Sequence, residues 1–428
     1  MNVSLRSKLR ASTRAVLCVL AAGCAQQPEF DIVIHGGTVY DGSGAVPPSV
    51  RDIGLKGDRI TAIGDLSQRR ASEIVDATGK VVAPGFVDAR GQSGVTLLAD
   101  GYGESHLRQG ITSEIIGDNS PAFWTMNTAD VATLQRYGLA FDWNGFVGYF
   151  QKLESRGTAI NVGTLVPSAL APGDENFLDA AMQAGAFGVI GDSTKPAELA
   201  RLASVAGRYK GVFEASVQPG ASPAEATEGL LDLAARTGTT LLVVDLISLE
   251  PPDMTVVAQH VNVSGQRGVR ALATVIPYAA TAGASDASVR ALAKYGVVIG
   301  TNSAAVSATT PGTTTPAAFG AFPRMLGQWV RDDHLLDLGE AIRRATSVPA
   351  SIFDLRQRGI IRENYFADIV VFDPNTIADR ATFEKPNEYA VGIDYVIVNG
   401  VVTFTPKGLT GSRAGHRLLG PGARRPAS

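Results

Sequence analysis

The sequence predicts an α/β protein whose centre is a barrel of eight parallel strands and eight helices, with β-rich segments at both ends of the chain. Between about residues 82 and 355, short apolar runs alternate with amphipathic helical stretches such as 196–209, 223–237 and 287–295. Repeated strand–helix units with a parallel sheet give this alternation. Eight candidate strands in about 270 residues also match the size of a (β/α)8 TIM-like barrel.

The eight candidate barrel strands are short apolar runs that are separated by the helical stretches or by turn residues. They are predicted at 85–88, 112–117, 160–165, 187–190, 212–215, 240–246, 271–275 and 297–301. In a barrel of this kind the chemistry lies where the strands end, at the C-terminal face.

The two ends of the chain alternate apolar and polar residues in short segments, as half-buried strands do. Near the start these segments are 31–35, 52–55 and 59–63, and near the end they are 367–374 and 395–400. We therefore divide the chain into a first β-rich part at 24–81, the barrel at 82–357, and a second β-rich part with a C-terminal tail at 358–428.

Residues 1–23 have the layout of a secretory signal peptide. Four basic residues (Arg6, Lys8, Arg10 and Arg14) precede an apolar run at 15–22 that is too short to span a membrane. The run ends in Leu-Ala-Ala-Gly-Cys, which resembles a bacterial lipobox and implies that Cys24 is lipidated as the first mature residue. A plain cleaved signal is the alternative. We expect an exported protein of the bacterial cell envelope, an outer-membrane lipoprotein that faces the periplasm and contacts the membrane through Cys24.

The charge and cysteine content of the chain argues against several classes of function. The 38 Lys and Arg residues against 41 Asp and Glu leave no basic excess to follow a phosphate backbone, so we expect no nucleic-acid binding. Removal of the signal peptide takes away four positive charges, so the formal net charge changes from −3 to −3 − 4 = −7. The two cysteines are Cys18 and Cys24, which leaves the rest of the chain without a thiol for a disulfide, a nucleophile or a metal ligand.

Eight short motifs, spread over most of the mature chain, are similar to those of a known protein family. They are Asp-Ile-Val-Ile-His-Gly-Gly-Thr-Val-Tyr-Asp-Gly-Ser-Gly at 31–44, Gly-Asp-Arg-Ile at 57–60, Val-Ala-Pro-Gly-Phe-Val-Asp at 82–88, Gln-Gly-Ile-Thr at 109–112, Gly-Ala-Phe-Gly at 185–188, Phe-Pro-Arg-Met-Leu-Gly at 322–327, Thr-Ser-Val-Pro-Ala at 346–350 and Ala-Asp-Ile-Val-Val-Phe-Asp at 367–373. Together they resemble the amidohydrolase superfamily, in its N-acyl-D-amino-acid deacylase (D-aminoacylase) branch.

The resemblance implies a metal-binding barrel and one small β-sandwich built from the two β-rich ends of the chain. It also implies a family reaction in which a metal-bound hydroxide hydrolyses a non-peptide C–N amide bond, such as that of an N-acyl-D-amino acid. Such chemistry needs a Lewis acid, and imidazole and carboxylate ligands to hold it at the strand ends.

The positions at which the family places its ligands carry other residues here. The family's His-x-His pair after the first strand is replaced by Arg90 and Gln92, and the family's Cys or acid after the second strand by Asp118 and Asn119. The resemblance therefore implies a former site of seven residues. Six of them stand at positions of metal ligands in the family, and these are Arg90, Gln92, Asp118, Asn119, Ser216 and Ser248. The seventh, Asn302, stands at the position of the family's proton-shuttling Asp. We therefore expect no metal ligand, no zinc and no catalytic residue of the family's kind.

Charged side chains suggest what replaced the metal. We expect Arg90 to pair with Asp118 or Asp245 across the former metal centre, because a guanidinium is permanently charged and forms a bidentate fork; a solvent-facing Arg is the alternative. Arg324 is a candidate to bind a ligand carboxylate at the barrel mouth, or else to brace a loop. Ser216 and Ser248 are expected to be polar fillers, and His106 to lie on a solvated helix.

The leading hypothesis is a degenerate amidohydrolase that binds a small molecule or an envelope protein without metal-dependent catalysis. The alternative is an active amidohydrolase, similar to a D-aminoacylase, with a rebuilt site that uses Asp118 and Asp245. A third hypothesis is an assembly subunit whose barrel mouth is plugged. The scaffold does not decide among them.

Overall fold

The computed structural model describes residues 28–117, 132, 134–167, 175–218, 222–279, 285–310 and 314–423. The predicted signal peptide, Cys24, Asp118 and Asn119 lie outside these ranges. Among the described residues, no helix combines the length and the apolar character needed to cross a membrane.

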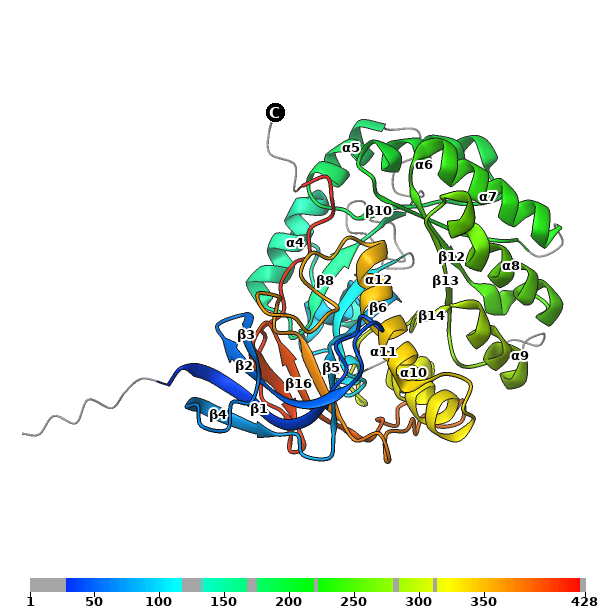
Figure 1. Ribbon diagram of the computed structural model, residues 1–428. Coiled ribbons are helices and arrows are strands. Elements are labelled where there is room, and N and C mark those ends of the chain that lie inside the picture. Colours follow the sequence, from blue (N-terminus) through cyan, green and yellow to red (C-terminus); the bar gives the residue numbers. More distant parts are fainter. Residues whose placement is uncertain are drawn as a thin grey trace, which may run out of the picture.

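The β-rich ends of the chain, which the sequence predicted, join in one nine-stranded sheet (Figure 1). Its strands are β1 (Phe30–Val39), β2 (Ser49–Lys56), β3 (Arg59–Gly64), β4 (Ala71–Asp76), β5 (Val81–Pro84), β15 (Ile369–Phe372), β16 (Ile393–Val398), β17 (Val401–Thr405) and β18 (Gly408–Leu409). The order is β18-β17-β16-β15-β5-β1-β2-β3, with β4 paired to β1. The antiparallel pair β5–β15 joins the two ends, so neither end completes the sheet alone.

Alternation of side chains gives this sheet its core. Ile32, Ile34, Ile53 and Leu55 are all buried and belong to one apolar cluster with Val371 and Ile397 of the C-terminal strands. The sheet extends to Pro84, past the boundary predicted at residue 81, because β5 pairs with both β1 and β15. These strands supply the β-sandwich portion of the fold.

The barrel contains all eight predicted strands, the third of which is divided into two short pieces. The strands are β6 (Phe86–Gly91), β7 (Ile111–Ile116), β8 (Asn161–Thr164), β9 (Val166–Pro167), β10 (Gly188–Ile190), β11 (Val212–Ser216), β12 (Thr240–Val244), β13 (Ala271–Val275) and β14 (Val298–Ile299). They pair in parallel in the orders β6-β7-β8 and β9-β10-β11-β12-β13-β14.

Backbone contacts close the barrel between its first and last strands. The amide of Asn302 donates to the carbonyl of Arg90 at 2.9 Å, and the amide of Gln92 donates to the carbonyl of Ser303 at 3.0 Å. β8 and β9 are separated by Leu165 alone, so the third strand bridges the two sheets. The C-terminal ends of these strands therefore gather at one end of the barrel, which we call the mouth.

Helices surround the strands, and Figure 1 shows α5 to α9 in a row outside β10 to β14. The α-helices are α1 (Thr96–Ala99), α2 (Glu104–Leu107), α4 (Gly145–Arg156), α5 (Glu175–Gln183), α6 (Pro196–Arg208), α7 (Pro223–Thr237), α8 (Pro251–Val263), α9 (Asp286–Ala291), α10 (Ala317–Arg324), α11 (Leu338–Ala345) and α12 (Ser347–Ile352). The 3-10 helices are η2 (Leu246–Ser248), η3 (Ser264–Arg267) and η4 (Leu292–Tyr295), and α10 continues into the π-helix η5 (Met325–Asp332).

Local sequence explains why such helices begin and end where they do. In α7, the Ser222 hydroxyl accepts from the Glu225 amide, and Pro223 occupies the first turn, where its missing N–H costs nothing. The helix ends at Gly238, whose φ of 69° lies in the left-handed region that glycine adopts freely. Leu230, Leu231 and Ala234 form the buried side.

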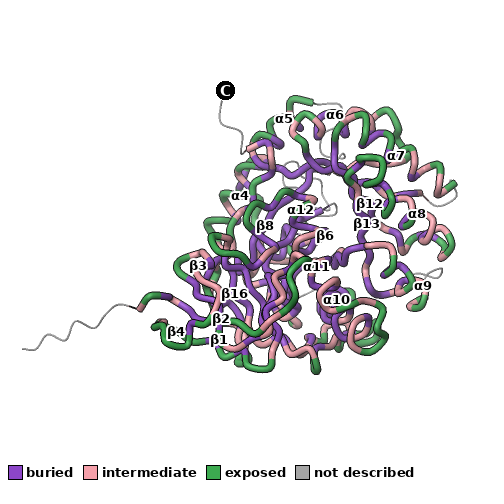
Figure 2. Tube along the Cα trace, in the orientation of Figure 1, coloured by how far each residue is buried: buried purple, intermediate pink, exposed green. Residues whose placement is uncertain are grey.

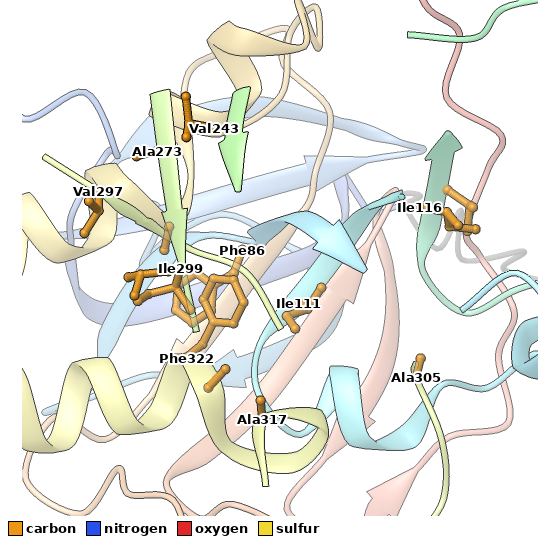
Figure 3. Packing of buried hydrophobic residues seen from close by; sticks show 14 of the residues in the cluster. Phe86, Ile111, Ile116, Val243, Ala273, Val297, Ile299, Ala305, Ala317 and Phe322 are labelled. Atoms are coloured by element: carbon orange, nitrogen blue, oxygen red, sulfur yellow. The ribbon is translucent and has the colours of Figure 1, made fainter. Parts of the chain in front are cut away.

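The barrel strands are largely buried and the outer helix faces are exposed (Figure 2). The largest apolar cluster lies between barrel strands and helices and reaches the sheet, and Figure 3 shows Phe86 against Phe322 within it. Their rings stack with centroids 5.6 Å apart, and Phe372 of β15 meets Phe86 edge-on at 6.2 Å. Barrel and sheet are therefore joined by apolar packing.

Candidate functional site at the barrel mouth

The mouth of the barrel holds a buried arginine with two carboxylates. Arg90 comes from β6, Glu214 from β11, and Asp245 directly follows β12. The Arg90 Nε donates to Glu214 Oε1 at 3.1 Å, and its two terminal nitrogens donate to Asp245 Oδ1 and Oδ2 at 2.5 and 3.0 Å. The expected pairing of Arg90 with Asp245 is confirmed.

Burial makes this pairing necessary, because Arg90 and Glu214 would otherwise be charges without partners away from water. Arg90 is 3% exposed and Glu214 is fully buried, whereas the Asp245 side chain keeps 34% of its surface exposed. A charge in such surroundings is stable only when it is paired and hydrogen-bonded, and the bidentate fork satisfies both needs. Asp245 reaches its place in a left-handed conformation with φ of 59°, which Asp tolerates better than most residues.

A second contact across the mouth joins Gln92 and Asn302. The Gln92 Nε2 donates to Asn302 Oδ1 at 2.6 Å. These residues follow the first and last barrel strands, and they lie at the positions that the resemblance assigns to the second histidine and the proton-shuttling Asp. The structure therefore brings Arg90, Gln92, Asp245 and Asn302 together at the mouth.

The two predicted serine positions differ in placement. Ser216 ends β11 and accepts from Gln218 Nε2 at 3.1 Å. Ser248 is exposed in η2, and its hydroxyl donates to the carbonyl of Asp245 at 2.7 Å. Because β12 ends at Val244 rather than at 246 as predicted, Asp245 and not Ser248 is the residue that follows the sixth barrel strand.

Arg324 braces a loop in this structure, which was the alternative to ligand binding. Its Nε donates to the carbonyl of Pro277 at 2.7 Å, and its terminal nitrogens donate to Asp379 and Asp286 at 3.1 and 2.6 Å. The guanidinium also lies over the Tyr278 ring, 4.6 Å from its centroid. All three guanidinium nitrogens are therefore engaged within the protein.

A second cluster of ionisable groups lies within the barrel wall, where the neighbouring strands β6 and β7 meet α2. Asp88, His106 and Glu114 are fully buried, and His106 Nε2 lies 3.6 Å from both Asp88 Oδ2 and Glu114 Oε2. The prediction that His106 lies on a solvated helix is wrong, because α2 packs this side chain inward. Burial is the main cause that raises the pKa of Glu114 to about 7.

This cluster holds the backbone that carries Arg90 and Gln92. Asp88 Oδ1 accepts from the Arg90 amide at 3.0 Å, and Glu114 Oε1 accepts from the Ser93 amide at 3.0 Å. Asp88 also binds the hydroxyl of Thr301 at 2.5 Å, on the opposite side of the barrel closure. Gly91 is required here, because a Cβ at this position would lie 1.9 Å from Glu114 Oε1.

The mouth residues do not fit the metal centre that the resemblance implies. Arg90 has no lone pair to give to a metal, and the side-chain oxygen of Asn302 accepts from Gln92. Within the described ranges, no three His, Cys, Asp or Glu side chains form a group that could hold a metal ion. Asp118 and Asn119 lie outside those ranges, and the structure leaves their positions open.

Comparison with known proteins identifies the family. The model of the amidohydrolase family matches residues 150–404. The N-acyl-D-glutamate deacylase of Alcaligenes xylosoxydans xylosoxydans is 30% identical, over 92% of this chain and 97% of that protein. The chain belongs to the amidohydrolase family. The D-aminoacylase of the same organism is 29% identical to this family member, over 91% of this chain and 97% of that enzyme.

Solved structures support the same fold for this amidohydrolase-family chain. The N-acyl-D-glutamate deacylase from Bordetella bronchiseptica, crystallised with zinc and a phosphonate inhibitor, superposes with a TM-score of 0.80 at 25% identity. The match covers 91% of this chain and 99% of that one. A D-aminoacylase crystal structure superposes with a TM-score of 0.78 at 23% identity, over 91% of this chain and all of the other.

Sequence reasoning missed two residues of the mouth region, Glu214 and Glu114. Each is an acid within a buried barrel strand, in Val-Phe-Glu-Ala-Ser at 212–216 and in Ile-Thr-Ser-Glu-Ile-Ile at 111–116. A carboxylate in such a run is rarely buried without a partner. That signal was present in the sequence and could have identified both residues.

Proposed function

We propose that this amidohydrolase-family protein binds a small molecule at the barrel mouth and does not perform the family's metal-dependent hydrolysis. The observation that carries the proposal is the two-point ion pair of Arg90 with Asp245, backed by Glu214. A fixed guanidinium at the position of a family histidine repels a metal dication, and it engages carboxylates that could otherwise serve as ligands. The loss of the metal is part of this proposal.

The metal content of the purified protein tests it. After growth with zinc, the mature protein should contain far less than one zinc per chain by inductively coupled plasma mass spectrometry. The matched variant carries Arg90→His and Gln92→His, which restores the family's pair of histidines, and should gain zinc relative to the wild type. Stoichiometric zinc in the wild type that is lost in Asp118→Asn or Asp245→Asn would overturn the proposal.

A second candidate function is hydrolysis of an N-acyl-D-amino acid or a related amide by a rebuilt site. The observation that favours it is the 30% identity to a deacylase over 92% of this chain, and the comparisons support this candidate better than the first. Asp245 would be the described participant, with Asp118 as the other carboxylate of the hypothesis. Turnover of N-acetyl-D-glutamate that is abolished in Asp245→Asn would establish it, whereas the first candidate predicts no turnover in either protein.

We also propose a location in the bacterial cell envelope, with a lipid on Cys24. The support is the basic and apolar layout of residues 1–23 and the Leu-Ala-Ala-Gly-Cys sequence that ends it. Cells labelled with radioactive palmitate should yield a labelled wild-type protein and an unlabelled Cys24→Ala variant. Label in both proteins, or in neither, would contradict lipidation at Cys24. An envelope protein is proposed as a partner on the same grounds of location.

A further inference from the structure

The ionic centre of the mouth has more negative than positive charge. Arg90 supplies one positive charge, and Glu214 and Asp245 each supply a negative one. Glu214 is fully buried and Arg90 nearly so, which leaves the partly exposed Asp245 as the side of the centre that faces a ligand. A ligand that approaches Asp245 therefore meets net negative charge, whereas a metal centre would present positive charge.

The sequence offers no compensating cation in the segments that the structure leaves undescribed within the barrel region. Residues 118–131, 133, 168–174, 219–221, 280–284 and 311–313 contain no Lys, Arg or His. They do contain the acids Asp118, Asp130 and Asp174. Wherever these segments lie, they can only leave the negative charge unchanged or add to it.

A small cavity adjoins Asp245 and fits one cationic head group. Its walls include Arg90, Asp245, Thr274, Ile276 and Asn302, and its volume is about 10 Å³. This is roughly the space of one water molecule, and a primary ammonium group is of similar size. Thr274 is buried to 3% exposure, so the cavity reaches beneath the surface of the mouth.

The polar atoms of this cavity favour an ammonium over a carboxylate. Both oxygens of Asp245 accept from Arg90, yet a carboxylate has about four lone-pair sites and can accept further hydrogen bonds. The one cation of this centre is engaged, because Arg90 donates to Glu214 and Asp245, and the Gln92 amide donates to Asn302. An ammonium brings three donors and a positive charge of its own, whereas an anion would meet the Asp245 carboxylate with only the neutral donors of Thr274 and Asn302 beside it.

We propose that the barrel mouth binds the primary ammonium group of a small ligand, held by Asp245 with Thr274 and Asn302 beside it. This inference rests on the proposed ligand-binding function and names the chemical class of the ligand. The partly exposed wall residues Ile247 and Ile276 would contact the carbon chain next to the ammonium, outside the cavity that the ammonium fills. In this proposal the net negative charge of Asp245, Glu214 and Arg90 attracts a cation, whereas the positive charge of a metal centre would attract an anion.

Isothermal titration calorimetry of the mature protein at low ionic strength tests the inference, with n-butylammonium as the probe. Butyrate and N-acetyl-D-glutamate are the anionic comparison ligands. We expect n-butylammonium to bind and Asp245→Asn to weaken it about tenfold or more, as expected for loss of an interaction of roughly 1.4 kcal/mol. Binding should also weaken as salt is added, because screening reduces the attraction between the charges.

Two variants control for an indirect effect on Arg90. Thr274→Val keeps the Arg90 ion pairs and removes one cavity hydroxyl, so it should weaken n-butylammonium binding by a few fold at unchanged thermal stability. Asp332→Asn removes an exposed carboxylate at the end of η5 and should bind as the wild type does. A wild-type affinity in Asp245→Asn and Thr274→Val would overturn the inference.

The outcomes also separate this inference from the proposed function. Binding of butyrate or N-acetyl-D-glutamate in preference to n-butylammonium would overturn the ammonium site and leave a ligand-binding mouth in place. Stoichiometric zinc with turnover of N-acetyl-D-glutamate would overturn the proposed function itself. Failure of all three probes to bind would overturn the ammonium site without any bearing on the metal content.

Discussion

Glu114 and His106 place a carboxylate oxygen and an imidazole nitrogen 3.6 Å apart, and both side chains are closed to solvent. Burial raises the pKa of Glu114 to about 7, the charge of Asp88 raises it as well, and His106 acts in the opposite direction. The buried Tyr149 phenol lies in the field of the same carboxylate, and its pKa is raised well above the usual value, mainly by burial. The folded protein therefore favours the protonated, neutral form of Glu114.

The pH dependence of stability follows from this shift. A folded-state pKa of about 7 against an ordinary 4.5 means that the folded protein binds the proton more tightly. The stability that protonated Glu114 contributes is fully present below about pH 4.5 and is lost as the pH rises towards 7. The difference of about 2.5 pKa units corresponds to roughly 3 kcal/mol of unfolding free energy. Glu114→Gln should flatten the fall in unfolding free energy between pH 5 and 7, measured by urea denaturation. The exposed control Glu363→Gln should keep the wild-type slope, and an unchanged slope in Glu114→Gln would contradict this assignment.

Removal of Arg90 should destabilise the barrel. Arg90→Ala leaves the buried carboxylate of Glu214 without its guanidinium partner, and loss of one member of a buried ion pair costs about 3–5 kcal/mol. Arg90→Lys should recover only part of this, because an ammonium cannot reproduce the three donations to Glu214 and Asp245. Urea denaturation at pH 7 measures both effects against the exposed Arg380→Ala. An Arg90→Ala protein as stable as this control would show that the ion pair contributes nothing measurable.

Much of the fold could be predicted because it depends on local patterns. Apolar runs of strand length, such as the one that forms β12, and amphipathic stretches such as α7 repeat often enough to reveal the barrel. The bounds were less predictable, since β12 ends at Val244 where an apolar Leu246 suggested a longer strand. The left-handed turn at Asp245 ends the strand, and no apolar pattern encodes such a turn.

The site could be predicted where a residue follows a family motif or the end of a predicted strand. Arg90 and Gln92 directly follow the Pro-Gly-Phe-Val-Asp motif, so their place at the mouth was foreseeable. Asp245 was expected to pair with Arg90 across 155 residues, but Glu214, which lies 124 residues from Arg90 and within a strand rather than after one, was missed. The contact of Glu214 with Arg90 depends on the packing of the barrel as a whole. His106 was misplaced for the same reason, because its burial results from distant segments that cover a four-residue helix.

Arg324 should matter for stability and not for ligand binding. Arg324→Ala removes donations to the carbonyl of Pro277 and to Asp286 and Asp379, and should lower the unfolding free energy by about 1–3 kcal/mol. Hydrogen exchange should increase at the amides of Tyr278 and α9, which this side chain ties together. The affinity for n-butylammonium should remain that of the wild type. A loss of affinity with unchanged exchange would instead assign Arg324 to the ligand site.

A buried polar network joins the sheet to the barrel, and Asp368 is at its centre. Its carboxylate accepts from the Arg358 guanidinium, from Asn161 Nδ2 of β8 at 3.2 Å and from the Asn399 amide at 2.8 Å. Asn399 also donates to Asn161 Oδ1 at 2.7 Å, so sheet and barrel residues satisfy one another. Each member that is removed leaves buried partners without hydrogen bonds.

Asp368→Ala should therefore cost about 3–5 kcal/mol, since it leaves the Arg358 charge buried without a carboxylate. A double-mutant cycle of Asp368→Ala with Asn161→Ala should show a coupling energy of about 1 kcal/mol or more, because the two side chains are in contact. The same cycle with the exposed Glu363→Ala in place of Asn161→Ala should show additive effects. Urea denaturation followed at two wavelengths gives the four free energies. Additivity in the first cycle would show that Asp368 and Asn161 contribute independently, which would contradict a network that couples the sheet to the barrel.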